Sequence, residues 1–322
     1  MFRTQSPFLV PPSVFLPARK RSPASSKALA VLLRSFDDNL LRRLKTLDPP
    51  AVSFAWLVRA LDVLVSTVAD AEALISDLKL VGSEKSLAAY LDDSVKVLDV
   101  CNSVSAEIER LRQGRLLVNF VVHLLRRSGE ADADLARARD SIAEYWTSRA
   151  GNGNRGSFEK SEVVVRDLAL GLESPPKGKI SSEEKLLRRT LYAVGTVTIF
   201  VLRATLAVLD ASPGPISTAE VHGDYPWVEI LNRLSTALGG QTRRSADEAE
   251  VMEKGLRSVS DVIDAASEEF TVNSRKFVDA VNTLETVTEH FSDKSDHLLN
   301  GVNEFFHSVL STRNAFLRNF RQ

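Results

Sequence analysis

The fold is decided by one stretch, residues 277–316, which reads FVDAVNTLETVTEHFSDKSDHLLNGVNEFFHSVLSTRNAF. Twelve of its positions, separated by alternating steps of four and three, form a heptad pattern, and nine of them are apolar. The three exceptions are Thr288, Ser295 and Thr312. A helix over residues 275–320 would be about 69 Å long. We expect its apolar seam to pack against other helices of this chain; the alternative partner is a second chain.

Apolar residues recur at steps of three and four through most of the chain before this stretch, which favours further helices. No proline interrupts the pattern between Ala51 and Ser174 or after Pro226. Gly114 is expected to mark a kink or a helix end, and residues 181–184 fit a capping box. The expected helices cover residues 29–47, 54–78, 87–111 with a continuation to 124, 135–145, 164–172, 182–210, a helix starting at 226–227, and 242–270.

The composition is that of a globular protein, with 322 residues, 44% apolar and 26% charged. We find no strand-like alternation and no internal repeat. The sequence therefore predicts an all-α fold, an elongated multi-helix bundle with long antiparallel helices and a C-terminal heptad-patterned helix. We expect a single helical domain over residues 27–322, with flexible linkers near 151–157, 173–181 and 211–225, after a disordered basic leader, 1–26.

Charge is distributed unevenly, although the formal net charge is −1. Residues 1–45 carry nine basic and two acidic side chains, whereas residues 241–310 carry seven basic and fourteen acidic ones. The basic leader fits either an organellar transit peptide or an unstructured segment that contacts an anionic membrane. Simple attraction between the basic and acidic segments explains the same asymmetry. Ser22 is a candidate phosphorylation site. The candidate contacts for an anionic surface are Arg19, Lys20 and Arg21.

One segment is apolar enough to be compared with a membrane span. Residues 190–209 contain a single charge, Arg203, and twenty residues are just long enough to cross a bilayer. A charge inside a span costs about 2.5–3.5 kcal/mol on insertion scales, and a helix buried on all sides of a soluble bundle has the same composition. We therefore expect a buried helix, with a membrane anchor over residues 191–209 as the alternative.

Motifs that carry chemistry are scarce. Residues 151–156 spell G-x-G-x-x-G, but a helical pattern precedes them where a dinucleotide site needs a strand, so we interpret them as a loop. His290, Asp293 and His297 share one side of the last helix and could contribute to a metal site, although a solvated polar stripe is the simpler interpretation. Cys101 is expected to be a small core residue. The sequence predicts no catalytic, cofactor-binding or metal-binding residues, and hence no enzyme and no cofactor.

Two blocks of sequence carry a resemblance to a known family, Tyr90-Leu-Asp-Asp-Ser-Val-Lys-Val-Leu-Asp-Val-Cys-Asn102 and Leu111-Arg-Gln-Gly-Arg-Leu-Leu117. They resemble the plant BYPASS family, and the resemblance extends over about residues 27–320. The leader has no counterpart in it, and the linkers at 151–156 and 173–180 look individual. Weaker matches are Ser53-Phe-Ala-Trp56, Leu187-Arg-Arg-Thr-Leu-Tyr-Ala-Val194, Pro226-Trp227, and Val302-Asn-Glu-Phe-Phe306 through Arg313 to Arg318.

The resemblance implies an all-helical plant protein without an established enzymatic activity. It implies a regulator or adaptor in root and shoot development, similar to proteins that restrain a mobile root-derived signal. The expected partners are proteins, with vesicle-tethering (exocyst) components as candidates, and an anionic membrane surface. We expect no nucleic-acid partner and no small-molecule substrate. The expected location is the cytoplasm, at the membrane periphery, with a plastid or a single-pass membrane location as alternatives.

Overall fold

The computed structural model describes residues 26–51, 53–76, 84–127, 132–150, 155–172, 181–209, 221–240, 248–265 and 275–320. Within these ranges all regular structure is helical and there is no strand, which confirms the predicted all-α class. The helices are α1 (Ser26–Lys45), α2 (Phe54–Ser76), α3 (Glu84–Arg127), α4 (Asp132–Ala150), α5 (Arg155–Gly171), α6 (Ser182–Leu209), α7 (Val228–Gly239), α8 (Glu248–Ala265) and α9 (Arg275–Phe320).

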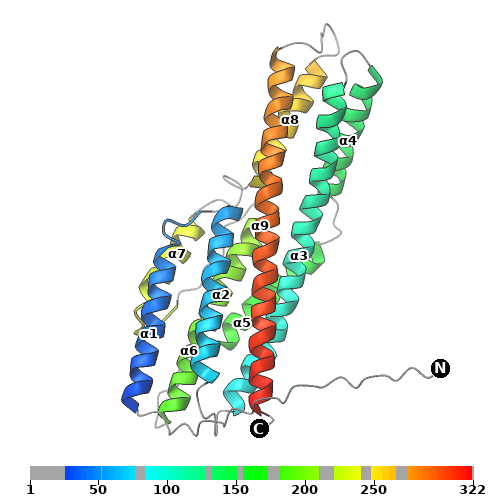
Figure 1. Ribbon diagram of the computed structural model, residues 1–322. Helices are drawn as coiled ribbons and strands as arrows, with labels where there is room; N and C mark the ends of the chain where they lie inside the picture. Colours follow the sequence, from blue (N-terminus) through cyan, green and yellow to red (C-terminus); the bar gives the residue numbers. More distant parts are fainter. Residues whose placement is uncertain are drawn as a thin grey trace, which may run out of the picture.

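Two long antiparallel helices, α3 and α9, form the backbone of the molecule (Figure 1). With 44 and 46 residues they are about 66 and 69 Å long. All twelve heptad positions of α9 are buried, and α9 packs against α2, α3 and α8. The expectation that the seam finds its partners within this chain is therefore confirmed.

The remaining helices divide between the two ends of the α3–α9 pair (Figure 1). At the upper end in Figure 1, α4 packs on α3, and α8 packs on α9 and α4, which gives a four-helix bundle. At the lower end, α2 packs on α9, and α6 packs on α2, α3, α5 and α1. The short helix α7 lies beside α1. The overall shape is the elongated bundle that the sequence predicts.

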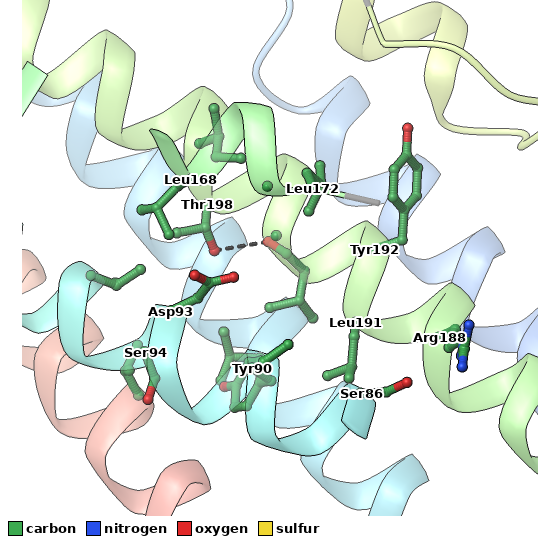
Figure 2. A pocket seen from close by; sticks show the side chains of 18 of the residues that line it. Ser86, Tyr90, Asp93, Ser94, Leu168, Leu172, Arg188, Leu191, Tyr192 and Thr198 are labelled. Carbon is green, nitrogen blue, oxygen red and sulfur yellow. Dashed lines mark hydrogen bonds between the residues drawn. The ribbon is translucent and has the colours of Figure 1, made fainter. Parts of the chain in front are cut away.

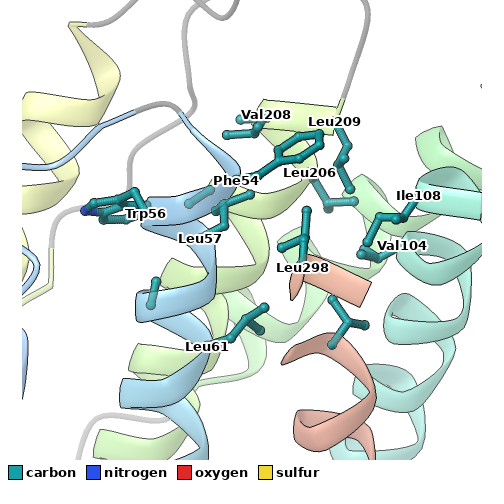
Figure 3. Close-up of a cluster of buried hydrophobic side chains, with 14 of the residues drawn as sticks. Phe54, Trp56, Leu57, Leu61, Val104, Ile108, Leu206, Val208, Leu209 and Leu298 are labelled. Atoms are coloured by element: carbon teal, nitrogen blue, oxygen red, sulfur yellow. The ribbon is translucent and has the colours of Figure 1, made fainter. Parts of the chain in front are cut away.

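The deepest part of the core lies where α2, α3, α6 and α9 meet (Figure 3). The side chains there are at most 2% exposed, which is the arrangement expected where four apolar helix faces converge. They are Phe54, Leu57 and Leu61 of α2, Val104 and Ile108 of α3, Leu206 and Leu209 of α6, and Leu298 of α9.

The helix end that was one of the two expectations for Gly114 is wrong, because α3 continues without a break from Glu84 to Arg127. Gly114 instead faces α4, where an added Cβ would lie 3.1 Å from Cε2 of Tyr145. The missing side chain therefore lets α3 and α4 approach closely. The roughly 1 kcal/mol that glycine costs in a helix interior is offset by this packing.

Several predicted boundaries shift. The helix expected over residues 164–172 begins at Arg155, inside the segment expected to be the first linker. The helix expected over 242–270 is described only over 248–265. Most of the linker residues, and the leader up to residue 25, lie outside the described residues. Helix starts are hard to place from periodicity alone, because only one face of a helix carries the apolar signal.

Helix α6 is the one described helix that is long and apolar enough to cross a membrane, judged by length and composition. In the structure most of its apolar stretch is buried, against α2, α3, α5 and α1. Its single charge in this stretch, Arg203, is not among the buried residues of the helix. The packing is that of a core helix in the bundle.

Candidate functional site

A cavity of about 220 Å³ lies in the lower half of the molecule between α3, α5 and α6 (Figure 2). It is partly open to solvent. Helices α2 and α9 each contribute one valine to its lining, Val68 and Val309. It combines an apolar interior with polar groups at its edge, which is the usual composition of a small-molecule site.

The interior of the cavity is built from aliphatic and aromatic side chains. Leu168 and Leu172 come from the end of α5, and Leu191 and Ile199 from α6. A glycine on α6, Gly195, leaves room for this arrangement, since an added Cβ would lie only 2.5 Å from Cδ1 of Leu172. The glycine thus lets the end of α5 lie close over α6 beside the cavity.

Four of the hydroxyl groups that line the cavity, those of Ser86, Ser94, Tyr192 and Thr198, are already engaged in hydrogen bonds. Thr198 donates to the carbonyl oxygen of Val194 at 2.8 Å, inside its own helix. Ser94 donates to the carbonyl oxygen of Leu91 at 2.7 Å and accepts from Nη1 of Arg313 at 2.8 Å. These four hydroxyl groups therefore do not need a ligand as partner.

The charged residues around the cavity differ in how they are paired. Asp93 forms an ion pair with Lys96 at 2.8 Å. Arg188 forms an ion pair with Glu184, whose carboxylate also accepts a hydrogen bond from Ser86 at 3.0 Å. The remaining cation, Lys85, is exposed and makes no ion pair within the described part of the chain.

A second polar cluster lies outside the cavity and ties α1 to α6 and to the segment before α7. Asp37 of α1 is only 2% exposed and pairs with Arg189 of α6. It also accepts a hydrogen bond from Nε1 of Trp227 at 3.1 Å. Arg189 lies over the ring of Tyr225 at 4.6 Å, and that ring stacks on Trp227. Burial raises the pKa of the Asp37 carboxyl, while Arg189 and the indole N–H act against the shift.

A third cluster lies inside the upper four-helix bundle. Glu253 of α8 accepts hydrogen bonds from Nε of Arg149 at 2.8 Å and from the hydroxyl of Tyr145 at 3.3 Å. Glu107 of α3 pairs with Arg110 at 2.5 Å and lies 3.8 Å from Nη1 of Arg149. The two buried carboxylates are thus each matched by arginine, as buried charges must be.

No group of three His, Cys, Asp or Glu among the described residues lies close enough to hold a metal ion. Burial raises the pKa of the Cys101 thiol to about 12, so this buried cysteine is held in its unreactive thiol form, and the expected core position is confirmed. The buried carboxylates serve to connect helices.

The site residues expected from the sequence are not brought together. Arg19, Lys20, Arg21 and Ser22 lie outside the described residues, so the structure places none of them. His290, Asp293 and His297 are exposed along α9 and join no metal-binding group in the described part of the molecule. The cavity was not predicted; the only sequence signal near it is Gly195, a glycine inside the apolar stretch of α6.

Comparison with known proteins shows which proteins this chain is similar to. A family model described as Protein ROH1-like matches residues 33–162. The chain is 35% identical over 228 residues to UPF0496 protein 4 of Oryza sativa subsp. japonica, an alignment that covers 68% of this chain and 49% of that protein. The chain therefore spans about half the length of this rice relative. No solved structure matches the chain.

Two Arabidopsis thaliana proteins align over more of their length. Protein BPS1, chloroplastic, is 28% identical over 334 residues, covering 97% of this chain and 92% of that protein. Protein ROH1D is 20% identical, covering 81% and 80%.

The similarities place the chain in a class of plant proteins, and the structure shows that the chain folds as a helical bundle. The chain belongs to the BPS1-related family of plant proteins, which also contains the ROH1-like and UPF0496 proteins. The resemblance stated from the sequence is thereby confirmed. Two of the resembling segments, 90–102 and 187–194, contribute residues to opposite sides of the cavity.

Proposed function

We propose that this protein is a non-enzymatic helical adaptor that regulates root and shoot development, similar to proteins that restrain a mobile root-derived signal. The observation that carries the proposal is the similarity to BPS1, which extends over 97% of the chain. The structure supports it in a second way. The charged clusters described above connect helices, as expected of a scaffold that presents surfaces to protein partners rather than a reactive centre.

The proposal is tested by expressing the chain in Arabidopsis thaliana plants that lack BPS1 and scoring root and shoot growth. We expect wild-type protein to restore growth. A variant with the core residue Leu298 replaced by Asp is the matched negative control, because a charge at this fully buried position disrupts the bundle. Accumulation of the wild-type protein to normal levels without any recovery of growth would contradict the proposed role.

We propose a cytoplasmic, membrane-peripheral location, in which the basic leader contacts anionic lipid and vesicle-tethering components are the protein partners. The excess of basic residues in the first 45 positions supports it. Deleting residues 1–26 should weaken binding to acidic liposomes, and unchanged binding would remove the membrane part of the proposal. The plastid alternative is supported by the word chloroplastic in the name of the Arabidopsis relative BPS1.

A second candidate function, a membrane-anchored trafficking factor, is favoured by the length and hydropathy of α6. Alkaline carbonate washing of plant membranes distinguishes the membrane-anchored from the membrane-peripheral proposal. A spanning α6 keeps the protein in the pellet, and Val197→Asp should release it. If α6 is a core helix, the protein is released by carbonate, and the same substitution at the fully buried Val197 unfolds it.

A further inference from the structure

We propose that the cavity between α3, α5 and α6 binds a small amphipathic carboxylate, with its apolar body inside the cavity and its charged group at Lys85. This inference goes beyond the adaptor function, which requires no small-molecule ligand. The expectation, drawn from the sequence, that the protein has no small-molecule substrate is left unchanged, since the ligand proposed here is bound and not transformed.

The size of the cavity sets the size of the ligand. An engineered cavity of about 150 Å³ in another protein binds benzene, which has six non-hydrogen atoms. By proportion, 220 Å³ accommodates roughly nine such atoms. That excludes sterols and long-chain lipids as fully enclosed ligands. It fits a monocarboxylate with a medium alkyl chain or one aromatic ring.

The lining of the cavity sets the character of the ligand's body. Val68, Val97, Leu168, Leu191 and Ile199 present hydrocarbon. The hydroxyl of Thr198, which lies near Leu168 in Figure 2, already donates to its own helix. Water inside such a cavity finds few partners, so an apolar body gains free energy by occupying it.

The charged residues at the edge of the cavity determine whether the polar group of the ligand is an anion or a cation. Asp93 is neutralised by Lys96, and the Arg188 guanidinium by Glu184. Lys85 is left as the cation without an acidic partner within the described residues, and it lies where the cavity meets solvent. A carboxylate on the ligand gives Lys85 an acidic partner, whereas an ammonium group on the ligand would have to compete with Lys96 for Asp93.

The experiment compares three probes that share one alkyl chain: octanoate, octan-1-ol and octylammonium. Isothermal titration calorimetry on the full chain measures their affinities. We expect octanoate to bind most tightly and octylammonium most weakly. Lys85→Gln should weaken octanoate binding by up to about fivefold, the upper end of the range for an exposed ion pair, and leave octan-1-ol unchanged. Lys276→Gln, an exposed lysine at the start of α9, is the matched control and should change neither affinity.

The second part of the experiment fills the cavity with a larger side chain. Thr198→Phe should abolish binding of octanoate and of octan-1-ol, whereas Thr198→Val, which keeps the side-chain volume, should preserve both. Circular dichroism verifies that each variant folds. If Thr198→Phe does not fold, Ala89→Phe at the edge of the cavity is used in its place.

Three results would overturn the proposal. The first is the absence of saturable octanoate binding to wild-type protein. The second is octanoate binding that survives filling of the cavity in a folded variant. The third is tighter binding of octylammonium than of octanoate, which would assign the polar end of the cavity to Asp93.

Discussion

The carboxylate of Glu248 accepts a hydrogen bond at 2.8 Å from the backbone N–H of Phe54, which lies 194 residues earlier in the chain. Its second oxygen accepts from the N–H of Ala55 at 3.4 Å. These amides belong to the first turn of α2, where backbone donors have no partner in the helix itself and the helix dipole favours a negative charge. The first residue of α8 therefore caps the start of α2.

Replacing Glu248 by Ala should lower the free energy of unfolding by about 1–3 kcal/mol, because buried donors of α2 lose a charged acceptor. Glu248→Gln should cost less, since the amide oxygen still accepts one of the two hydrogen bonds. Urea unfolding measures both changes. Glu289→Ala, at an exposed position of α9, is the control and should stay within about 0.5 kcal/mol. Equal losses for Glu248→Ala and the control would mean that the cap contributes nothing.

The Asp37 carboxyl should make stability depend on pH in an unusual direction. Its pKa is raised above the ordinary value of 3.8, mainly by burial, although Arg189 opposes the shift. The folded chain thus holds this proton more tightly than the unfolded chain. The resulting contribution to stability is fully present below the unfolded pKa and is lost as pH rises through the folded pKa.

We therefore expect the unfolding free energy of wild type minus that of Asp37→Asn to fall as pH rises above about 4 and to level off once the carboxyl is ionised in the folded chain as well. Chemical denaturation at a series of pH values measures this difference, with Asp38→Asn, an exposed neighbour, as the control. A difference that instead rises with pH would mean that the ion pair with Arg189 outweighs the cost of burial.

The pair of Glu253 and Arg149 should show strong coupling in a double-mutant cycle. Glu253→Leu leaves the guanidinium of Arg149 without its 2.8 Å partner, with only the more distant Glu107 at 3.8 Å. We expect a loss of about 3 kcal/mol in unfolding free energy. Adding Arg149→Met should recover much of it, because apolar residues of similar size often replace a buried ion pair without loss. A double variant less stable than Glu253→Leu alone would refute this account.

Two polar seam positions of α9 should respond differently to valine. Thr288 donates to the carbonyl oxygen of Leu284 at 2.6 Å, a group that the helix satisfies anyway, so Thr288→Val should change stability by less than about 1 kcal/mol. Thr312 donates to Oε2 of Glu72 at 2.5 Å, and Thr312→Val should cost about 1–2 kcal/mol because that carboxylate loses a donor. Thermal unfolding of the two variants side by side measures the contrast. Equal changes would mean that the contact with Glu72 is energetically neutral.

The seam of α9 was predictable because a heptad pattern is a local property of the sequence. All twelve positions from Phe277 to Phe316 are buried where the spacing predicts it. The continuity of α3 through Gly114 was not predictable, since the compensating contact comes from Tyr145 on another helix. The cap on α2 is equally invisible, because no spacing rule connects Glu248 with Phe54.

The candidate site could be predicted even less. The cavity depends on the space left between five helices, and that space is set by how side chains far apart in sequence fill it. Leu172 directly follows the last residue of α5 and Gly195 lies on α6, beyond the linker, and neither residue type indicates a ligand. What the sequence did indicate, the polar stripe of His290, Asp293 and His297, turns out to face solvent.

The position of α9 as the last described helix has a consequence for synthesis on the ribosome. Helices α2, α3 and α8 all bury apolar side chains against α9, so each emerges before the surface that will cover it exists. A nascent chain that has not yet reached residue 275 exposes these three apolar faces together. They stay uncovered until residues 275–320 have been synthesised, and messages truncated before α9 should yield aggregating products.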